Sequence, residues 1–186
     1  MPTLDIVTAA LEHLAPLRLA ASWDSVGLLV APRRDTISRV MTCLTLTPQV
    51  AAEAVCERAD LVVSHHPLPF RPVPRITPAT GPGRVLLDLI GAGAGIWSSH
   101  TAWDSAAGGI NDQLARLLGL ASVAPIEPDA EVPLVGFGRA GMAVVAVGHH
   151  SSERFSMDML AERLAAAVAG LACWASRDER DPLGWL

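Results

Sequence analysis

The chain has 186 residues, of which 51% are apolar and 18% are charged, and this composition excludes disorder as its main state. A formal net charge of -5 excludes a protein that binds nucleic acid mainly through a basic face. The three cysteines are odd in number and widely spaced, which excludes a disulfide framework or a paired-cysteine metal site.

The N-terminal segment predicts a packing helix. Thr3 is a suitable N-cap, leucine and valine follow at helical spacing, and Pro16 ends the pattern. The segment lacks the basic region and apolar core of a signal peptide, and no run approaches the ~18 apolar residues that span a bilayer. We therefore expect a cytoplasmic protein with no membrane partner.

A polar turn and a strand come next. Asp24 and Ser25 precede the apolar run 26–30, which Pro32 terminates. Asp24 and Ser25 either satisfy backbone groups within the turn or line a functional site, and the local sequence leaves both interpretations open.

Residues 39–64 predict a strand, a helix and a second strand. The first strand covers 39–46, and Thr47 and Pro48 supply an N-cap and a first helical residue for a helix that extends to about Arg58. The second strand covers 61–64. This order is typical of an α/β fold with a parallel or mixed sheet, in which functional groups collect beyond the carboxyl ends of the strands.

Two adjacent histidines follow the second of these strands. His65 and His66 come directly after the buried run 61–64, and Pro67 follows them. At a strand end both imidazoles can converge on one cavity and hold two neighbouring metal ions. Such a pair is also found in exposed loops and among hydrogen-bonded core residues, and this stretch alone does not separate the three.

The proline-rich segment 69–83 predicts a surface loop beside the histidines, followed by a helix over 84–90. Arg71 and Arg75 in this loop are either solvated or placed to meet an anionic substrate. The glycine run 91–95 fits the end of a helix and a turn better than it fits a phosphate-binding loop.

Residues 96–112 repeat the pattern of a strand that ends in polar residues. A short apolar strand leads into His100, a polar loop carries Asp104, and Asn111 is a good N-cap for the next helix. A carboxylate in this position can bridge two metal ions, because each of its oxygens can bind a different ion.

The C-terminal part contains a third such transition. Residues 121–133 have the composition of a linker and mark an internal junction, and 142–147 predict a strand, which excludes a dinucleotide site at the preceding glycines. His149 and Glu153 follow at a spacing of four, which places both on one face of a helical turn. A helix from Ser156 and a strand over 171–175 complete the pattern.

Four blocks of this sequence, taken in order, resemble the Nif-three-like dinuclear-metal proteins, which are often labelled GTP cyclohydrolase type-two homologues. The blocks are residues 23–29 (WDSVGLL), 64–68 (SHHPL), 100–112 (HTAWDSAAGGIND) and 148–154 (GHHSSER). The resemblance covers nearly the whole chain, and it implies one compact α/β domain over 1–186 with a mixed sheet and flanking helices, in a shortened form of the family fold.

The resemblance also implies a pair of divalent metals and a ring-shaped homohexamer. The metal ligands that it implies are His65, His66, Asp104, His149 and Glu153. The sequence departs from the family pattern at Thr45, where an aspartate is usual, and after Gly141, where a further segment of a typical member is absent. His150 occupies a position that usually holds another residue type.

From these observations we expect a divalent-metal-dependent hydrolase that opens the ring of a nucleotide, in the manner of a GTP cyclohydrolase. His100 and His150 are the nearest residues for proton transfer. A phosphoesterase and a metal-binding scaffold or regulator without turnover are the alternatives. Nitrogen and oxygen ligands without a thiolate suit Zn²⁺, Mn²⁺, Fe²⁺ or Ni²⁺.

We also expect self-association. Five tryptophans in a small apolar chain should leave part of their surface uncovered in a monomer, and such surface usually marks contacts with other chains. The loop 69–83 and the C-terminal residues 184–186 are the predicted contact segments.

Overall fold

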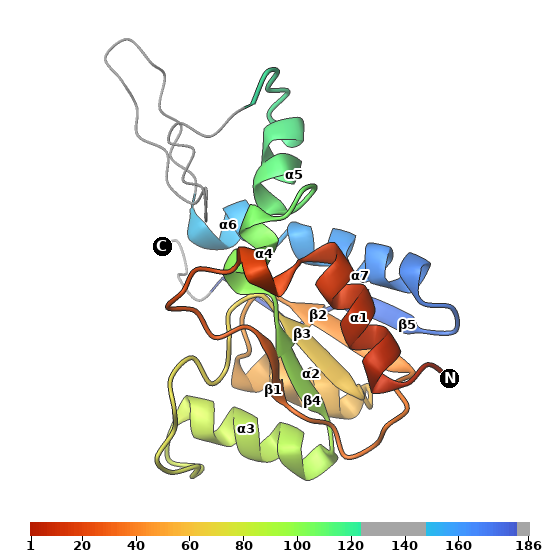
Figure 1. The fold of residues 1–186 in the computed structure, drawn as a ribbon. Coiled ribbons are helices and arrows are strands. Elements are labelled where there is room, and N and C mark those ends of the chain that lie inside the picture. The colour runs from red at the N-terminus through yellow and green to blue at the C-terminus, as the bar shows by residue number, and fades with distance from the viewer. Residues whose placement is uncertain (124–147, 182–186) are drawn as a thin grey trace.

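The computed structural model describes residues 1–123 and 148–181, which form a five-stranded mixed sheet in the order β1-β4-β3-β2-β5 (Figure 1). The strands are β1 (Gly27–Val30), β2 (Arg39–Cys43), β3 (Leu61–Ser64), β4 (Gly95–Ser98) and β5 (Ala172–Ala175). β1 is antiparallel to β4, and the other neighbours are parallel. The predicted α/β fold with a mixed sheet is therefore confirmed.

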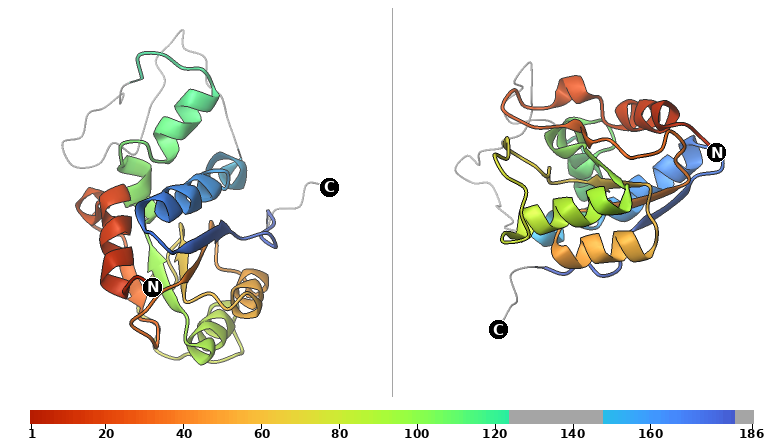
Figure 2. Two further views of the ribbon diagram at one scale, coloured as in Figure 1. Left: turned by 90° about the vertical axis from the view of Figure 1, so that its right-hand side faces the viewer. Right: turned by 90° about the horizontal axis from the view of Figure 1, so that it is seen from below.

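Helices cover both faces of this sheet (Figures 1 and 2). The helices are α1 (Leu4–Leu14), α2 (Pro48–Cys56), α3 (Gly81–Ala92), α4 (His100–Ser105), α5 (Ile110–Leu117), α6 (His149–Glu153) and α7 (Ser156–Ala167), with a short 3-10 turn at Leu17–Leu19. α1 and α7 pack on one face, and α2 and α3 pack on the other. No helix in the described part of the chain has the length and apolar content that a bilayer crossing requires.

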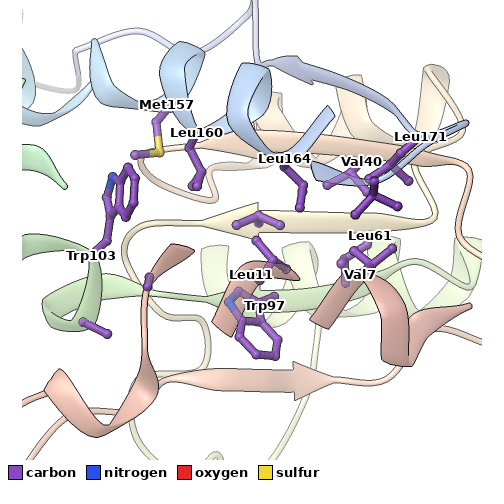
Figure 3. Packing of buried hydrophobic residues seen from close by; sticks show 14 of the residues in the cluster. Val7, Leu11, Val40, Leu61, Trp97, Trp103, Met157, Leu160, Leu164 and Leu171 are labelled. Atoms are coloured by element: carbon purple, nitrogen blue, oxygen red, sulfur yellow. The ribbon is translucent and has the colours of Figure 1, made fainter. Parts of the chain in front are cut away.

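The alternation of side chains along the strands divides the core into two layers. Leu61 and Val63 belong to the layer beneath α1 and α7, whereas Val62 between them belongs to the layer beneath α2 and α3. Figure 3 shows the first layer, in which Leu160 and Leu164 of α7 face the sheet. This packing on both faces makes the central strands rigid supports for the residues that follow them.

The register of the central strands brings their carboxyl ends to one edge. Cys43 at the end of β2 pairs with Ser64 at the end of β3, and Ser64 pairs with Ser98 at the end of β4. The predicted helix start at Thr47 is confirmed, because its side chain accepts a hydrogen bond from Val50 N. The residues that follow these three strands therefore share one end of the sheet.

Two expectations for the segments after the strands were wrong. Asp104 lies in the short helix α4 rather than in a loop, and α5 is capped by Gly109 rather than by Asn111. A Cβ at Gly109 would lie 1.9 Å from Trp103 O, so this close approach of α4 requires glycine. Asn111 instead donates from Nδ2 to Asp104 O at 3.0 Å.

Other boundaries shift without changing the order of elements. α3 begins at Gly81 rather than at residue 84, because Thr80 supplies an N-cap hydroxyl for Gly83 N. β2 ends at Cys43, three residues before the predicted end. The predicted strand 142–147, most of the predicted junction 121–133 and the C-terminal contact segment 184–186 lie outside the described residues.

Candidate metal centre

The two adjacent histidines continue the ladder between β2 and β3. The backbone N–H of His65 donates to Cys43 O, and that of His66 donates to Leu44 O, both at 2.9 Å. Ser98 at the end of β4 donates from its hydroxyl to His65 O at 2.7 Å. Three strands thus fix the backbone of this pair, so both imidazoles are held at the carboxyl edge of the sheet.

The structure brings all five ligands implied by the resemblance into one cluster. Glu153 Oε2 lies 2.8 Å from His149 Nε2, 3.3 Å from His66 Nε2 and 3.8 Å from His65 Nε2. Asp104 Oδ1 lies 3.7 Å from His65 Nε2, and the Nε2 atoms of His66 and His149 are 3.3 Å apart. Residues far apart in sequence therefore place three imidazoles and two carboxylates around one small volume.

His65 is the most buried member of this cluster. Its side chain is 1% exposed, and within the described residues its Nδ1 has no hydrogen-bond partner. Burial, together with the neighbouring His66 and His100, holds the pKa of His65 well below its usual range. The ring is therefore neutral at pH 7, which is the form that binds a metal ion.

Burial shifts the pKa of Asp104 in the opposite direction. Desolvation, reinforced by the negative charge of Glu153, raises the pKa of Asp104 from 3.8 to about 7. Two carboxylates that share one poorly solvated volume repel each other unless a proton or a cation lies between them. A divalent cation in this cluster would remove that repulsion.

His100 adds a fourth imidazole on the other side of the cluster. Its ring centroid lies 5.2 Å from that of His65 and 5.7 Å from that of His66. It begins α4 with a φ of 27°, a conformation that non-glycine residues rarely adopt. Its Nδ1 is 2.8 Å from Asp24 Oδ1, which leaves Nε2 as the nitrogen available to the cluster.

Asp24 performs both of the roles that the sequence left open. Its Oδ1 accepts the backbone N–H of Ser25 within the turn, and it also pairs with His100. Burial alone would raise the pKa of Asp24, but hydrogen bonds from the Thr101 hydroxyl and from His100 outweigh that effect and lower it. Asp24 is therefore an ionised carboxylate that orients His100.

His150 is the second residue predicted for proton transfer, and it lies in α6 between His149 and Glu153. It lines an open concavity of about 890 Å³ along α7 and β5, together with Arg154 and Trp174. None of the five ligands implied by the resemblance lines that concavity. The concavity therefore differs from the cluster in its lining residues.

Thr45 occupies the position where the resemblance predicted a departure from the family. Its hydroxyl lies 2.8 Å from Nδ1 of His66, which leaves Nε2 of His66 free to face His149 and Glu153. A partner on the far nitrogen is the usual means by which proteins orient a metal-binding imidazole. The threonine can therefore hold this ring although it carries no charge.

The donor atoms form two overlapping groups that share His66. One group is His65, His66 and His100, the other is His66, His149 and Glu153, and the ligand atoms of each lie within 4.8 Å of one another. Imidazole nitrogens and carboxylate oxygens in such groups fit divalent ions such as Zn²⁺, Mn²⁺, Fe²⁺ or Ni²⁺. The lowered pKa of His65 and the raised pKa of Asp104 agree with this fit.

The chain matches one protein family in sequence. A profile described as Duf34/NIF3 (NGG1p interacting factor 3) matches residues 2–142. The chain is 37% identical over 131 residues to NIF3-like protein 1 of Drosophila melanogaster and 37% identical over 172 residues to the GTP cyclohydrolase 1 type 2 homolog of Streptomyces coelicolor. These alignments cover 70% and 92% of this chain but only 45% and 59% of the two relatives.

Solved structures give the same result for the fold. A Bacillus cereus protein related to NIF3 superposes with a TM-score of 0.65 at 30% identity, over 69% of this chain and 35% of that protein. HcgD from Methanocaldococcus jannaschii superposes with a TM-score of 0.63 at 28% identity, over 68% of this chain and 51% of that protein. Because the profile matches residues 2–142, which is more than half of the chain, the chain belongs to the DUF34/NIF3 family.

Proposed function

We propose that the chain is a divalent-metal-dependent hydrolase with a dinuclear centre, acting on the ring of a nucleotide. The observation that carries this proposal is the cluster in which three imidazoles and two carboxylates surround one small volume. The activity named for the bacterial relatives supports the choice of a nucleotide. Paired divalent ions supply Lewis acidity and activate water near neutral pH.

The residues of the chain would hold the ions and transfer protons. His65, His66, His149 and Glu153 would hold the ions, and Asp104 would join them as a carboxylate ligand. His100 is oriented by Asp24 through Nδ1, so its Nε2 can accept a proton from water or return one to the substrate. His150 lines the concavity along α7 and β5, and its part in proton transfer stays a prediction.

An aromatic corner beside the cluster supports a substrate with a planar ring. Trp23 and Phe70 meet edge to face with ring centroids 6.2 Å apart, and each contacts His100 in the same manner at 6.2 and 6.4 Å. Trp23 is 60% exposed and Phe70 is 39% exposed, so their rings remain open to a ligand. A hydrogen bond of 2.9 Å from Ser25 Oγ to Phe70 O fixes the two loops together.

The test is an assay of metal-loaded protein with GTP. We expect turnover by the wild-type chain in Mn²⁺ or Zn²⁺, and Asp104→Ala should reduce it to the rate of the metal-free protein. Trp23→Ala should retain the metal but weaken nucleotide binding by ~10–100-fold, since stacking of a base on an aromatic ring is worth ~1–3 kcal/mol. Product formation and nucleotide binding by calorimetry are measured in parallel.

Matched variants separate the possible outcomes. Leu117→Ala removes another exposed apolar side chain, on α5, and should leave nucleotide binding unchanged. Hydrolysis of generic phosphoesters without attack on the ring would favour a phosphoesterase. Metal binding without turnover of either substrate class would contradict the hydrolase and favour a scaffold or regulator.

We also propose that the chain assembles into a homohexamer. Exposed apolar residues support this proposal: Val73 and Ile76 lie in the predicted contact loop 69–83. Closed symmetry would repeat the metal centre around a shared interior. Light scattering at micromolar concentration should give a mass near six chains of 19.5 kDa, and the mass of a single chain would contradict the ring.

A further inference from the structure

Glu179 is a buried carboxylate in the segment after β5. Its side chain is 1% exposed, and each of its oxygens accepts a backbone hydrogen bond. Leu44 N donates to Oε2 at 3.0 Å, and Thr45 N donates to Oε1 at 2.6 Å. Arg154 Nε lies 2.8 Å from Oε2 and supplies the opposite charge that a buried carboxylate needs.

The hydrogen bonds from Leu44 N and Thr45 N connect Glu179 to His66. Leu44 and Thr45 form the turn directly after β2, and Leu44 O accepts the backbone N–H of His66. The Thr45 hydroxyl is 2.8 Å from Nδ1 of the same histidine. Glu179 therefore fixes the turn that holds His66 by both its backbone and its ring.

The ion pair with Arg154 connects Glu179 to the residue next to Glu153. Arg154 directly follows Glu153, and its guanidinium also donates from Nη2 to Ser176 O at 2.6 Å. With the ion pair to Glu179, these bonds tie the end of α6 to the segment after β5. Glu179 thus stands between the two parts of the chain that supply His66 and Glu153, whose facing atoms are 3.3 Å apart.

We propose that Glu179 is a positioning residue of the metal centre, which sets the separation of His66 and Glu153 by holding Thr45 and Arg154 at the same time. This inference rests on the proposed metal site. Glu179 does not touch the ions; it acts through the two residues that orient their ligands. Changes to partners that orient ligands commonly reduce metal affinity by ~10–100-fold.

Glu53 on α2 offers a matched control within the same region. It is also buried, and its carboxylate accepts hydrogen bonds from the Ser176 hydroxyl and from the backbone of Arg177 and Asp178. It holds the same segment after β5 but contacts neither the turn at Thr45 nor Arg154 in the hydrogen bonds of the described residues. A purely structural effect of this segment should therefore be shared by both carboxylates.

The experiment compares Co²⁺ binding by the full-length wild type, Glu179→Gln, Glu53→Gln and Thr45→Val. Calorimetry and the visible absorption of the bound Co²⁺ are recorded at a temperature at which circular dichroism shows every variant folded. We expect Glu179→Gln and Thr45→Val to weaken Co²⁺ binding by ~10–100-fold and to change the absorption spectrum. Glu53→Gln should keep the wild-type spectrum and an affinity within about threefold, even where it lowers the melting temperature.

Several results would overturn the inference. Equal losses of affinity in Glu179→Gln and Glu53→Gln would show that general order of the segment matters rather than the contacts of Glu179. Wild-type affinity and spectrum in Glu179→Gln would remove the positioning role while leaving the metal site intact. If Glu179→Gln does not fold, an unchanged spectrum in Thr45→Val overturns the link to His66. A wild-type chain that binds no Co²⁺ would end both this inference and the proposed function.

Discussion

His66→Ala should remove at least one of the proposed ions, because Nε2 of His66 is the ring nitrogen that faces the cluster and a single imidazole nitrogen binds a single ion. The loss of affinity should exceed the ~10–100-fold that follows from changes to orienting partners, since a direct ligand is removed. The side chain is 28% exposed, so its removal leaves little empty space in the core. Elemental analysis after reconstitution with Zn²⁺ or Mn²⁺ should give no more than about one ion per chain.

An exposed histidine provides the control for this variant. His13 is exposed in the last turn of α1 and belongs to neither donor group, so His13→Ala should keep the metal content of the wild type. His65→Ala is a poorer choice, because that ring is buried and its loss would also create a cavity. A full complement of tightly bound metal in His66→Ala would contradict the role of His66 as a ligand.

The stability of the metal-free protein should depend on pH through Asp104. Since burial and Glu153 raise the pKa of Asp104 to about 7, the folded chain holds a proton there that the unfolded chain releases near pH 3.8. The stability contributed by this proton is present below pH 4 and is lost as the pH rises to about 7. At about 1.4 kcal/mol per pKa unit, the loss reaches at most roughly 4 kcal/mol.

Asp104→Asn isolates this effect. His65 contributes with the opposite sign, because its lowered pKa means that the unfolded chain binds a proton there first, so stability rises as the pH approaches 6.5. The free energy of unfolding is measured in urea at pH values from 4 to 8. As the pH increases, the value for Asp104→Asn should rise relative to that of the wild type. Asp88→Asn on the exposed side of α3 should run parallel to wild type. Parallel curves for Asp104→Asn would contradict the raised pKa.

Metal binding should reverse this dependence on pH. An ion requires the ionised form of Asp104, so the affinity for Zn²⁺ or Mn²⁺ should rise as the pH passes through about 7. At saturating metal the wild type should then be more stable at pH 8 than the metal-free protein, and Asp104→Asn should gain less from added metal.

The sequence predicts the elements of this fold well where local signals agree. The Thr47 and Pro48 start signal placed α2, and the apolar run before His65 placed β3 at its observed bounds. The helix α4 was missed because it is short and its residues have no apolar periodicity. Its position depends on the packing of Trp103 against α7, where Nε1 donates to the Ser156 hydroxyl at 2.8 Å, and this contact spans 53 residues.

The site was predictable only in part, for the same reason. Strand ends followed by polar residues indicated His65, His66 and Asp104, and a spacing of four indicated His149 and Glu153. The resemblance then joined these five residues into one ligand set. No spacing relates Asp24 to His100, and Glu179 lies in a terminal segment without a motif. Both are found only when the chain is folded, since their partners come from distant turns.

The place of β5 in the sheet has a consequence for how the protein is made. β2 lies between β3 and β5, so one side of this inner strand stays unpaired until residues 172–175 have left the ribosome. An unpaired inner strand is a template for association between chains. Glu179 is synthesised after β5, so His65 and His66 are present in the nascent chain long before Glu179 can fix the turn that orients His66. Metal supplied during synthesis would thus meet an incomplete centre, and loading is best carried out on the finished protein.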